Sequence, residues 1–172
     1  GKPVLEPASI CFLNGGLFPE THRARPIQKL LASPLGPLLS LFSGEAQFRK
    51  SFSAVFGPRT QPSDDELKDF WTLISRADGH RLFPKLLGYI AERRKNRERW
   101  LGAMQNTQVP LRLINGPEDP VSGAQMVQRY RELIPSADVV LLPGIGHYPQ
   151  VEAPERTLEA FLGFQALLSV KA

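Results

Sequence analysis

Two polar residues that each follow an apolar segment by a few positions are the residues in this chain best suited to chemistry. Asp119 lies in the sequence INGPEDP, four residues after a predicted strand over residues 109–115. His147 lies in PGIGHYPQVEAP, five residues after a second predicted strand over residues 138–142. A carboxylate can accept the Nδ1–H of an imidazole and stabilise its protonated form, so that the ring acts as a general base near neutral pH. We therefore predict that Asp119 and His147 are the acid and base of a hydrolytic site.

The elements between these two residues must bring them to one edge of a sheet. His147 follows Asp119 by 28 positions, and the sequence between them predicts a helix over residues 122–134 that Ser122 caps. A strand–helix–strand unit of this length is parallel, and its right-handed crossover places both strand ends at the same edge, where ligands bind. Taken singly, Asp119 would be a turn residue before a proline, and His147 a surface residue or a partner of Glu152. Their matched positions favour a functional pair.

The rest of the chain predicts one more strand and several helices. Further elements are expected over residues 8–13 (strand) and over residues 64–77, 82–104 and 154–170 (helices). Ser63 and Glu66 are expected to form a capping box at the start of the helix over residues 64–77. The last helix has an apolar stripe, which predicts the face that it buries. This stripe comprises Leu158, Phe161, Leu162, Gln165 and Leu168.

The positive net charge of the chain could indicate a nucleic-acid-binding protein, but the distribution of the charged residues does not favour this function. The formal net charge is +4, and much of the excess comes from the run RRKNRER over Arg93–Arg99. No aromatic residues alternate with these charges, as a binder of single strands would require. We expect a solvated helix face and no nucleic-acid partner. No apolar run approaches the roughly 20 residues that span a bilayer, which leaves association with a membrane surface open.

The cysteine and histidine content predicts no metal site and no cofactor. Cys11 is the only cysteine, which excludes an intrachain disulfide and a thiolate cluster, and it is expected to pack as a small hydrophobic residue. His22 and His80 lack partners at ligand spacing and are expected in loops or at the surface. No signal peptide is visible, so the compartment is unknown, with the cytoplasm slightly favoured.

Longer stretches of the sequence resemble a known family. INGPEDP and PGIGHYPQVEAPE look like the last third of an α/β-hydrolase, in which a G-x-x-D turn carries the acid and a G-H-x-x-x-x-E-x-P stretch the base. Three further segments resemble the mesoderm-specific transcript family, near the epoxide hydrolase and haloalkane dehalogenase branch. These segments are LNGGLFPETHR (13–23), VFGPRTQPSDDEL (55–67) and YIAERRKNRERWLGAM (89–104). The resemblance implies an α/β fold, the C-terminal part of an α/β-hydrolase with parallel strands, flanking helices and a helical cap.

The resemblance also implies a domain organisation and a function. It divides the chain into a core strand before the cap (1–17), a helical cap (18–106) and C-terminal core strands and helices (107–172). Asp119 and His147 carry over as acid and base of a triad whose nucleophile, an aspartate or a serine, lies upstream, since no G-x-S-x-G turn occurs here. The substrate would be a small, fairly apolar haloalkane, epoxide or ester, with no cofactor. The residues expected to contact it are Asn14, Phe18 and Tyr148.

Several alternatives stay open at this point. Epoxide hydrolases offer two cap tyrosines, whereas Tyr89 is the only tyrosine of the predicted cap, which weakens the epoxide assignment. Trp71, Trp100 or Asn14 could hold a halide, although Trp71 is expected in the core of the cap. The chain alone would be inactive and would associate with its missing N-terminal half or with itself. A catalytically silent binding or scaffold protein is the alternative function, and a basic surface-binding domain built on Arg93–Arg99 is favoured least.

Overall fold

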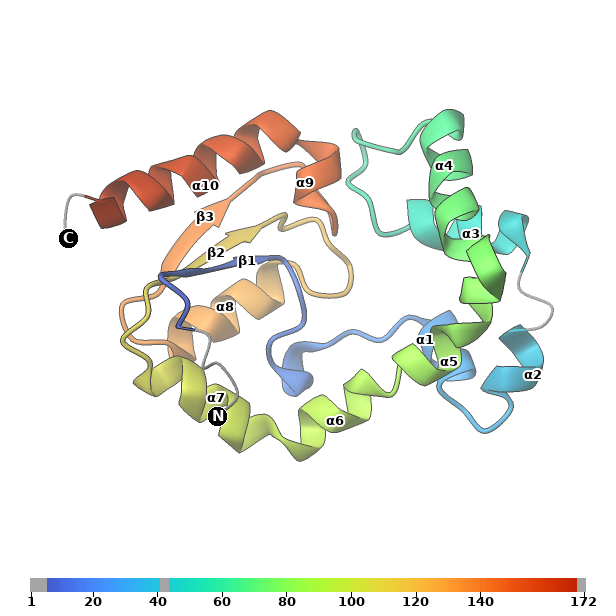
Figure 1. The fold of residues 1–172 in the computed structure, drawn as a ribbon, viewed down its shortest axis with the longest axis horizontal. Helices are drawn as coiled ribbons and strands as arrows, with labels where there is room; N and C mark the ends of the chain where they lie inside the picture. Colours follow the sequence, from blue (N-terminus) through green and yellow to red (C-terminus); the bar gives the residue numbers. More distant parts are fainter. Residues whose placement is uncertain (1–5, 41–43, 170–172) are drawn as a thin grey trace.

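The fold is built on a small parallel sheet. The computed structural model describes residues 6–40 and 44–169, so the predicted end of the last helix at Val170 lies outside the described residues. Strands β1 (Ile10–Leu13), β2 (Leu111–Asn115) and β3 (Asp138–Leu141) pair in parallel in the order β1-β2-β3 (Figure 1). The α/β class and the parallel arrangement predicted from the sequence are confirmed.

Helices cover both faces of this sheet. Leu113 and Ile114, neighbours on the central strand β2, are both 0% exposed, and neighbouring side chains of a strand point to opposite faces. Helix α8 (Ala124–Leu133) covers one face and α10 (Pro154–Ser169) the other (Figure 1). Burial on both faces explains why β2 is apolar along most of its length rather than alternating.

The larger hydrophobic core lies between the sheet and α8. Its buried members are Phe18, Leu101, Leu113, Met126, Val127, Tyr130 and Ile134. Tyr130 is fully buried and its hydroxyl has no hydrogen-bond partner in the described part of the chain. Burial raises the pKa of Tyr130 to about 12, with smaller contributions from Asp138 and Cys11. The aromatic ring, and not the hydroxyl group, therefore holds this residue in place.

We expect the substitution Tyr130→Phe to stabilise the chain. It removes a buried hydroxyl without a partner and keeps the ring, so the free energy of unfolding should rise by about 1 kcal/mol. Urea unfolding measures this change. Tyr89→Phe is the control, because the Tyr89 side chain is about half exposed and its hydroxyl stays in water. A loss of stability in Tyr130→Phe would show that the hydroxyl has a partner in solution.

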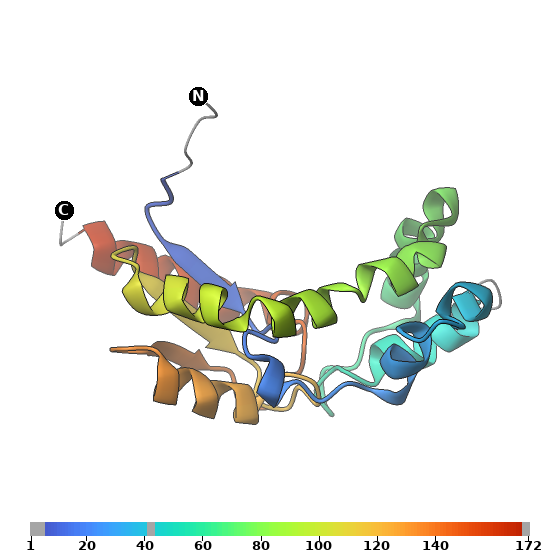
Figure 2. The same ribbon diagram turned by 90° about the horizontal axis from the view of Figure 1, so that it is seen from below.

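Short helices form the region between β1 and β2. They are η1 (Pro19–Thr21), α1 (Pro26–Leu31), α2 (Gly36–Ser40), α3 (Glu45–Ser53), α4 (Asp64–Ser75), η2 (Arg76–Leu82), α5 (Phe83–Leu86), α6 (Tyr89–Lys95) and α7 (Arg97–Asn106). Helices α1 to α5 lie to one side of the sheet, and α6 and α7 lead back to it (Figures 1 and 2). The single helical segment predicted over residues 82–104 is wrong, since it is interrupted at Gly88 and Asn96. The Asn96 backbone leaves the helical region, and its side chain bonds back to the Glu92 carbonyl.

The N-termini of α4 and α8 test the two helix caps predicted from the sequence. The capping box of α4 is confirmed, because Ser63 Oγ accepts from Glu66 N and the Glu66 carboxylate accepts from Ser63 N. The predicted cap at Ser122 is wrong. Helix α8 starts after Gly123, and Ser122 Oγ donates to Asp119 instead. The Ser122 hydroxyl thus bonds the ionised carboxylate three residues earlier, and its side chain does not cap α8.

The last helix buries a different face from the one predicted. Thr157 and Phe164 are its buried residues, whereas Leu158 and Leu162 of the predicted stripe are each 55% exposed. Cys11 is half-buried against the core on the α10 side, and this burial raises the pKa of its thiol, as expected of a packed residue. Across residues 6–40 and 44–169, none of the helices is long and apolar enough to cross a membrane.

Candidate active site

The two predicted residues meet at the carboxyl edge of the sheet. Asp119 lies in the loop after β2 and His147 in the loop after β3, and His147 Nδ1 is 2.7 Å from Asp119 Oδ2. The Asp119 side chain is 0% exposed, whereas the His147 side chain is 27% exposed. The pair therefore has a buried acid and a base that solvent or a ligand can reach, as general-base chemistry requires.

The loop conformation holds the Asp119 carboxylate in one orientation. Its Oδ1 accepts from Val121 N at 2.8 Å, which closes a local turn. Its Oδ2 accepts from Ser122 Oγ at 2.6 Å and from Asn14 Nδ2 at 2.9 Å, in addition to His147. Burial by itself would raise the pKa of Asp119, but the hydrogen bond and charge of His147, with the bonds from Ser122 and Asn14, lower it to about 2. The carboxylate is ionised at neutral pH.

The ionised carboxylate determines the tautomer of the histidine. A carboxylate only accepts hydrogen bonds, so the neutral His147 ring carries its proton on Nδ1. The lone pair of Nε2 is then free to take a proton from a substrate, a nucleophile or a water. The backbone N–H of His147 also donates to Val55 O at 2.9 Å, which anchors the loop that carries the ring.

The low pKa of Asp119 predicts a loss of stability in acid. The folded-state pKa of about 2 lies below the ordinary 3.8, so the folded chain binds fewer protons between these values. The stabilisation is fully present above about pH 4 and disappears as the pH falls through 2, and it amounts to about 2 kcal/mol. Urea unfolding at pH 5 and pH 2.5 measures it. In Asp119→Asn the free energy of unfolding should differ less between the two pH values. An unchanged difference would show that Asp119 is not the source of the loss of stability in acid.

Asn14 joins the three loops at this edge. It follows β1, with a φ of 48°, and its Nδ2 donates to Asp119 Oδ2 and to the carbonyls of Gly116 and Gly146. Its Oδ1 accepts from Gly116 N at 2.7 Å. Asn14 was predicted to contact the substrate, but its amide is buried and bonded to the protein on both sides. These bonds suit it to position Asp119 instead.

Glu152 is the residue of this site whose role the sequence did not reveal. Its Oε2 accepts from Gly57 N, Thr60 Oγ1 and Gly146 N, and its Oε1 accepts from Tyr148 N. It bonds the backbone on both sides of His147 rather than the imidazole. Its place in the G-H-x-x-x-x-E-x-P stretch was the available signal. The segment around Gly57, assigned to the cap, thus packs on the loop that carries His147.

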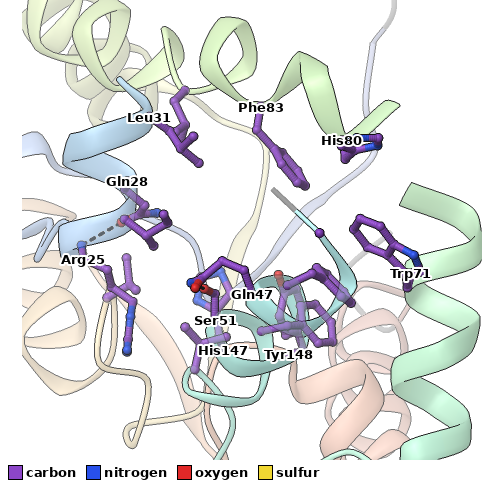
Figure 3. A pocket seen from close by; sticks show the side chains of 17 residues that line it. Arg25, Gln28, Leu31, Gln47, Ser51, Trp71, His80, Phe83, His147 and Tyr148 are labelled. Carbon is purple, nitrogen blue, oxygen red and sulfur yellow. Dashed lines mark hydrogen bonds between the residues drawn. The ribbon is translucent and has the colours of Figure 1, made fainter. Parts of the chain in front are cut away.

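An apolar pocket of about 240 Å³ opens beside His147. Figure 3 shows His147 and Tyr148 on one side of it and Leu31 and Phe83 on the other. Tyr148, predicted to contact substrate, lines this pocket and lies edge-on to the His147 ring at 4.8 Å between centroids. Its other walls include Ile27, Phe48, Phe52, Val55, Trp71, His80, Leu87 and Val121. The residues beside the base therefore suit a small apolar ligand.

Three other predicted placements differ in the structure. Phe18 lies in the core against Tyr130 and not at the pocket, so it serves packing. His80, expected at the surface, lines the pocket and contacts Trp71, with 5.4 Å between ring centroids. Trp71 also lines the pocket, besides packing on Phe48. In the described ranges, no cluster of three or more His, Cys, Asp or Glu side chains could hold a metal ion.

Comparison with known proteins identifies the fold. No protein-family model matches the sequence. The mesoderm-specific transcript protein of Mus musculus is 41% identical over 160 residues, which cover 91% of this chain and 48% of that protein. A loop variant of the haloalkane dehalogenase DbeA from Bradyrhizobium elkanii superposes with a TM-score of 0.72 at 12% identity, over 95% of this chain and 60% of the dehalogenase. Over the part that it covers, the chain has the fold of an α/β-hydrolase.

The same fold is found in other solved structures. A thermophilic esterase from Thermogutta terrifontis superposes with a TM-score of 0.67 at 16% identity, over 94% of this chain and 56% of the esterase. The chain spans about half the length of the curated relatives that it matches, and it matches their carboxyl-terminal portion. The parallel sheet with helices on both faces corresponds to a part of the solved structures that superpose on it, of which the chain covers 56–60%.

Proposed function

We propose that this chain supplies the acid and base of a hydrolase whose nucleophile comes from a preceding segment of a longer protein. The observation that carries the proposal is the 2.7 Å contact between His147 Nδ1 and Asp119 Oδ2 beside an apolar pocket. The relatives, about twice the length of the chain, support the presence of such a segment in the parent protein. The parent reaction is the cleavage of a substrate by water.

Two routes are compatible with this acid and base. With an aspartate nucleophile, the carboxylate displaces a halide or opens an epoxide to form an ester, and His147 Nε2 deprotonates the water that hydrolyses it. With a serine nucleophile, Nε2 takes the hydroxyl proton during attack on an ester and returns it to the departing alcohol. It then deprotonates the water that hydrolyses the acyl-serine and returns the proton to the serine oxygen. In both routes Asp119 stabilises the protonated ring, and neither route requires a cofactor.

The pocket supports a small, fairly apolar substrate. Its volume of about 240 Å³ and its aromatic walls suit a short alkyl or aryl group. Tyr89, the only tyrosine of the predicted cap, is about half exposed, is not among the pocket residues, and has the Arg93 guanidinium over its ring. A tyrosine donor for an epoxide oxygen is therefore lacking in the described cap. Haloalkanes, with Trp71 at the pocket as a halide donor, and esters are the favoured substrates.

The exposed apolar surface supports an association partner. In the described part of the chain β1 pairs with β2 alone, so its other edge is open. Leu158 and Leu162 of α10 present apolar side chains to solvent. We propose that the preceding segment of the parent covers these features and that the chain alone associates with itself. Size-exclusion chromatography over a range of concentrations should show oligomers of the chain, and a concentration-independent monomer would contradict this.

Hydrolysis assays on the chain and on its full-length parent test the function. The substrates are 4-nitrophenyl butyrate, 1-bromobutane and styrene oxide, one for each bond type. We expect turnover of at least one by the parent, its loss in His147→Gln, and none by the chain alone. Activity of the chain alone that His147→Ala abolishes would overturn the upstream nucleophile. A parent that turns over none of the three substrates would support the catalytically silent alternative, and turnover that His147→Gln leaves unchanged would remove His147 from the mechanism.

A further inference from the structure

Arg25 is a partly exposed cation at the apolar pocket and has no anionic partner among the described residues. It precedes α1 and lines the pocket together with His147. Its Nη1 donates to Ala54 O at 2.9 Å, which is the one hydrogen bond of this guanidinium within residues 6–40 and 44–169. Its Nε and Nη2 have no acceptor there and, unlike two nitrogens of Arg93, they are not fully buried. The guanidinium thus keeps donors for a ligand that enters the pocket.

Backbone contacts hold this guanidinium beside the loop that carries His147. Ala54, whose carbonyl accepts from Arg25, is followed by Val55, whose carbonyl accepts from His147 N at 2.9 Å. At the start of the side chain, Arg25 N donates to Gln28 Oε1 at 2.9 Å. Two consecutive carbonyls therefore connect the cation to the base. Because consecutive Cα atoms are about 3.8 Å apart, a group bound to Arg25 lies a short chain away from a bond beside His147.

The polar and the aromatic groups of the pocket lie on different sides. Figure 3 shows Arg25 on one side of the pocket and Trp71 and His80 on the opposite side. Gln47 and Ser51 also line the pocket, and Gln47 Nε2 donates to Ser51 Oγ at 2.8 Å. None of the described residues that line the pocket carries a carboxylate. The pocket therefore combines one unpaired cation with apolar walls.

A monocarboxylate with an apolar chain matches this combination. Guanidinium N–H groups form charge-assisted hydrogen bonds with a carboxylate, and these bonds are stronger where apolar walls exclude water. One cation balances one carboxylate. A phosphate monoester, with a charge of about −2 at neutral pH, would leave excess charge beside the apolar walls. A neutral ligand would leave the donors of Arg25 without an acceptor.

We propose that the pocket binds a carboxylic acid with a short apolar chain, its carboxylate on Arg25 and its chain beside His147 and toward Trp71. The acid is a substrate only if the hydrolase function proposed above holds, and the bond to be cleaved then lies in the chain. The substrate class is in that case a halogenated carboxylate or a monoester of a dicarboxylic acid, rather than a neutral haloalkane or ester. Arg25 is a residue that determines specificity and takes no part in the chemical steps.

Binding of sodium hexanoate to the chain tests the site, with 1-hexanol as the neutral ligand of equal length. Ionic strength is kept constant with sodium chloride, and nuclear magnetic resonance follows the Arg25 Nε–H and the His147 ring. We expect saturable shifts of both signals and a Kd for hexanoate at least about tenfold below that for 1-hexanol. Arg25→Gln should raise the hexanoate Kd at least about tenfold, and Arg25→Lys, which keeps the charge, should raise it less.

Arg23→Gln is the matched control, because it removes the same charge two residues earlier, from an exposed side chain that does not line the pocket. Its hexanoate Kd should equal that of the unaltered chain. The proposal is overturned if the unaltered chain binds hexanoate no more tightly than 1-hexanol, an outcome that requires no variant to fold. It is equally overturned if Arg25→Gln leaves the hexanoate Kd unchanged, or raises it only as much as Arg23→Gln does.

Kinetics of the full-length parent separate this substrate class from the hydrolase function itself. The matched pairs are 6-bromohexanoate with 1-bromohexane and mono(4-nitrophenyl) adipate with 4-nitrophenyl hexanoate. In the pair that is turned over, kcat/KM should be at least about tenfold higher for the anionic substrate, and Arg25→Gln should remove this preference. Equal kcat/KM values would overturn the substrate class and leave the hydrolase function intact. Hexanoate binding by the chain without turnover by the parent would support the site and contradict the hydrolase function.

Discussion

Asparagine in place of Asp119 should lower kcat of the full-length hydrolase by about 10³- to 10⁴-fold, the size of effect found when the acid of a hydrolytic triad is neutralised. The carboxylate accepts the Nδ1–H of His147 at 2.7 Å and is ionised, so in the proposed mechanism it orients the ring and stabilises the positive charge that the ring takes up. An amide that turns its NH₂ toward the ring leaves Nε2 protonated and unable to act as a base. Steady-state kinetics on whichever substrate the parent hydrolyses measures the loss.

A neighbouring carboxylate provides the control for this experiment. Glu118→Gln makes the same chemical change one position earlier, on an exposed side chain without a hydrogen bond in the described structure. Its kcat should stay within about twofold of the unaltered enzyme, as expected of surface changes. A loss in Asp119→Asn no larger than that in Glu118→Gln would remove Asp119 from the mechanism. The kcat of Asn14→Ala should lie between those of Asp119→Asn and Glu118→Gln, because this substitution removes one of the hydrogen bonds that orient Asp119.

Alanine in place of Glu152 should be among the most destabilising single changes. The carboxylate accepts from three backbone N–H groups, those of Gly57, Gly146 and Tyr148, and from the Thr60 hydroxyl. Removal leaves these partly buried donors without an acceptor, so we expect the free energy of unfolding to fall by about 3 kcal/mol or more. Urea unfolding of the chain measures this loss.

Two further variants separate this role from a general effect of charge. Glu155→Ala removes an exposed carboxylate three residues later and should change stability by less than about 0.5 kcal/mol. Glu152→Gln keeps one acceptor oxygen and loses the charge. Its free energy of unfolding should lie between those of Glu152→Ala and Glu155→Ala. If Glu152→Ala behaves like Glu155→Ala, the hydrogen bonds of Glu152 contribute nothing to stability in solution.

Features that depend on neighbours in sequence could be predicted. Ser63 and Glu66 are three residues apart, and their reciprocal bonds form as soon as the first turn of α4 forms. The strands β2 and β3 are mostly apolar, and a parallel pair of strands places the residues that follow them at one edge. That rule suffices to predict that Asp119 and His147 lie together. The distance, the orientation and the ionisation of the pair required the structure.

Features that depend on contacts across the chain were mispredicted or missed. The charge run suggested that Arg93 is solvated, yet Tyr89 and Gly16 enclose it. His80 has no partner at ligand spacing in the sequence, but the fold brings it to Trp71 at the pocket. The stripe of α10 was assigned from periodicity alone, which states that a face is apolar but not which element covers it. Each of these errors concerns how an element packs, which the pattern of its own residues does not record.

The sequence by itself determined the α/β class, the parallel strands and the proximity of Asp119 and His147 at one edge of the sheet. Local patterns of apolar and turn-forming residues encode these features, and chain geometry limits how strands connect. Only the tertiary structure showed that Asn14 bonds Asp119 and that Glu152 bonds the backbone beside His147. It also showed that two nitrogens of Arg93 are buried without an acceptor in the described residues. Hydrogen bonds between loops are made by residues up to 132 positions apart, as between Asn14 and Gly146, and depend on packing that no local pattern records.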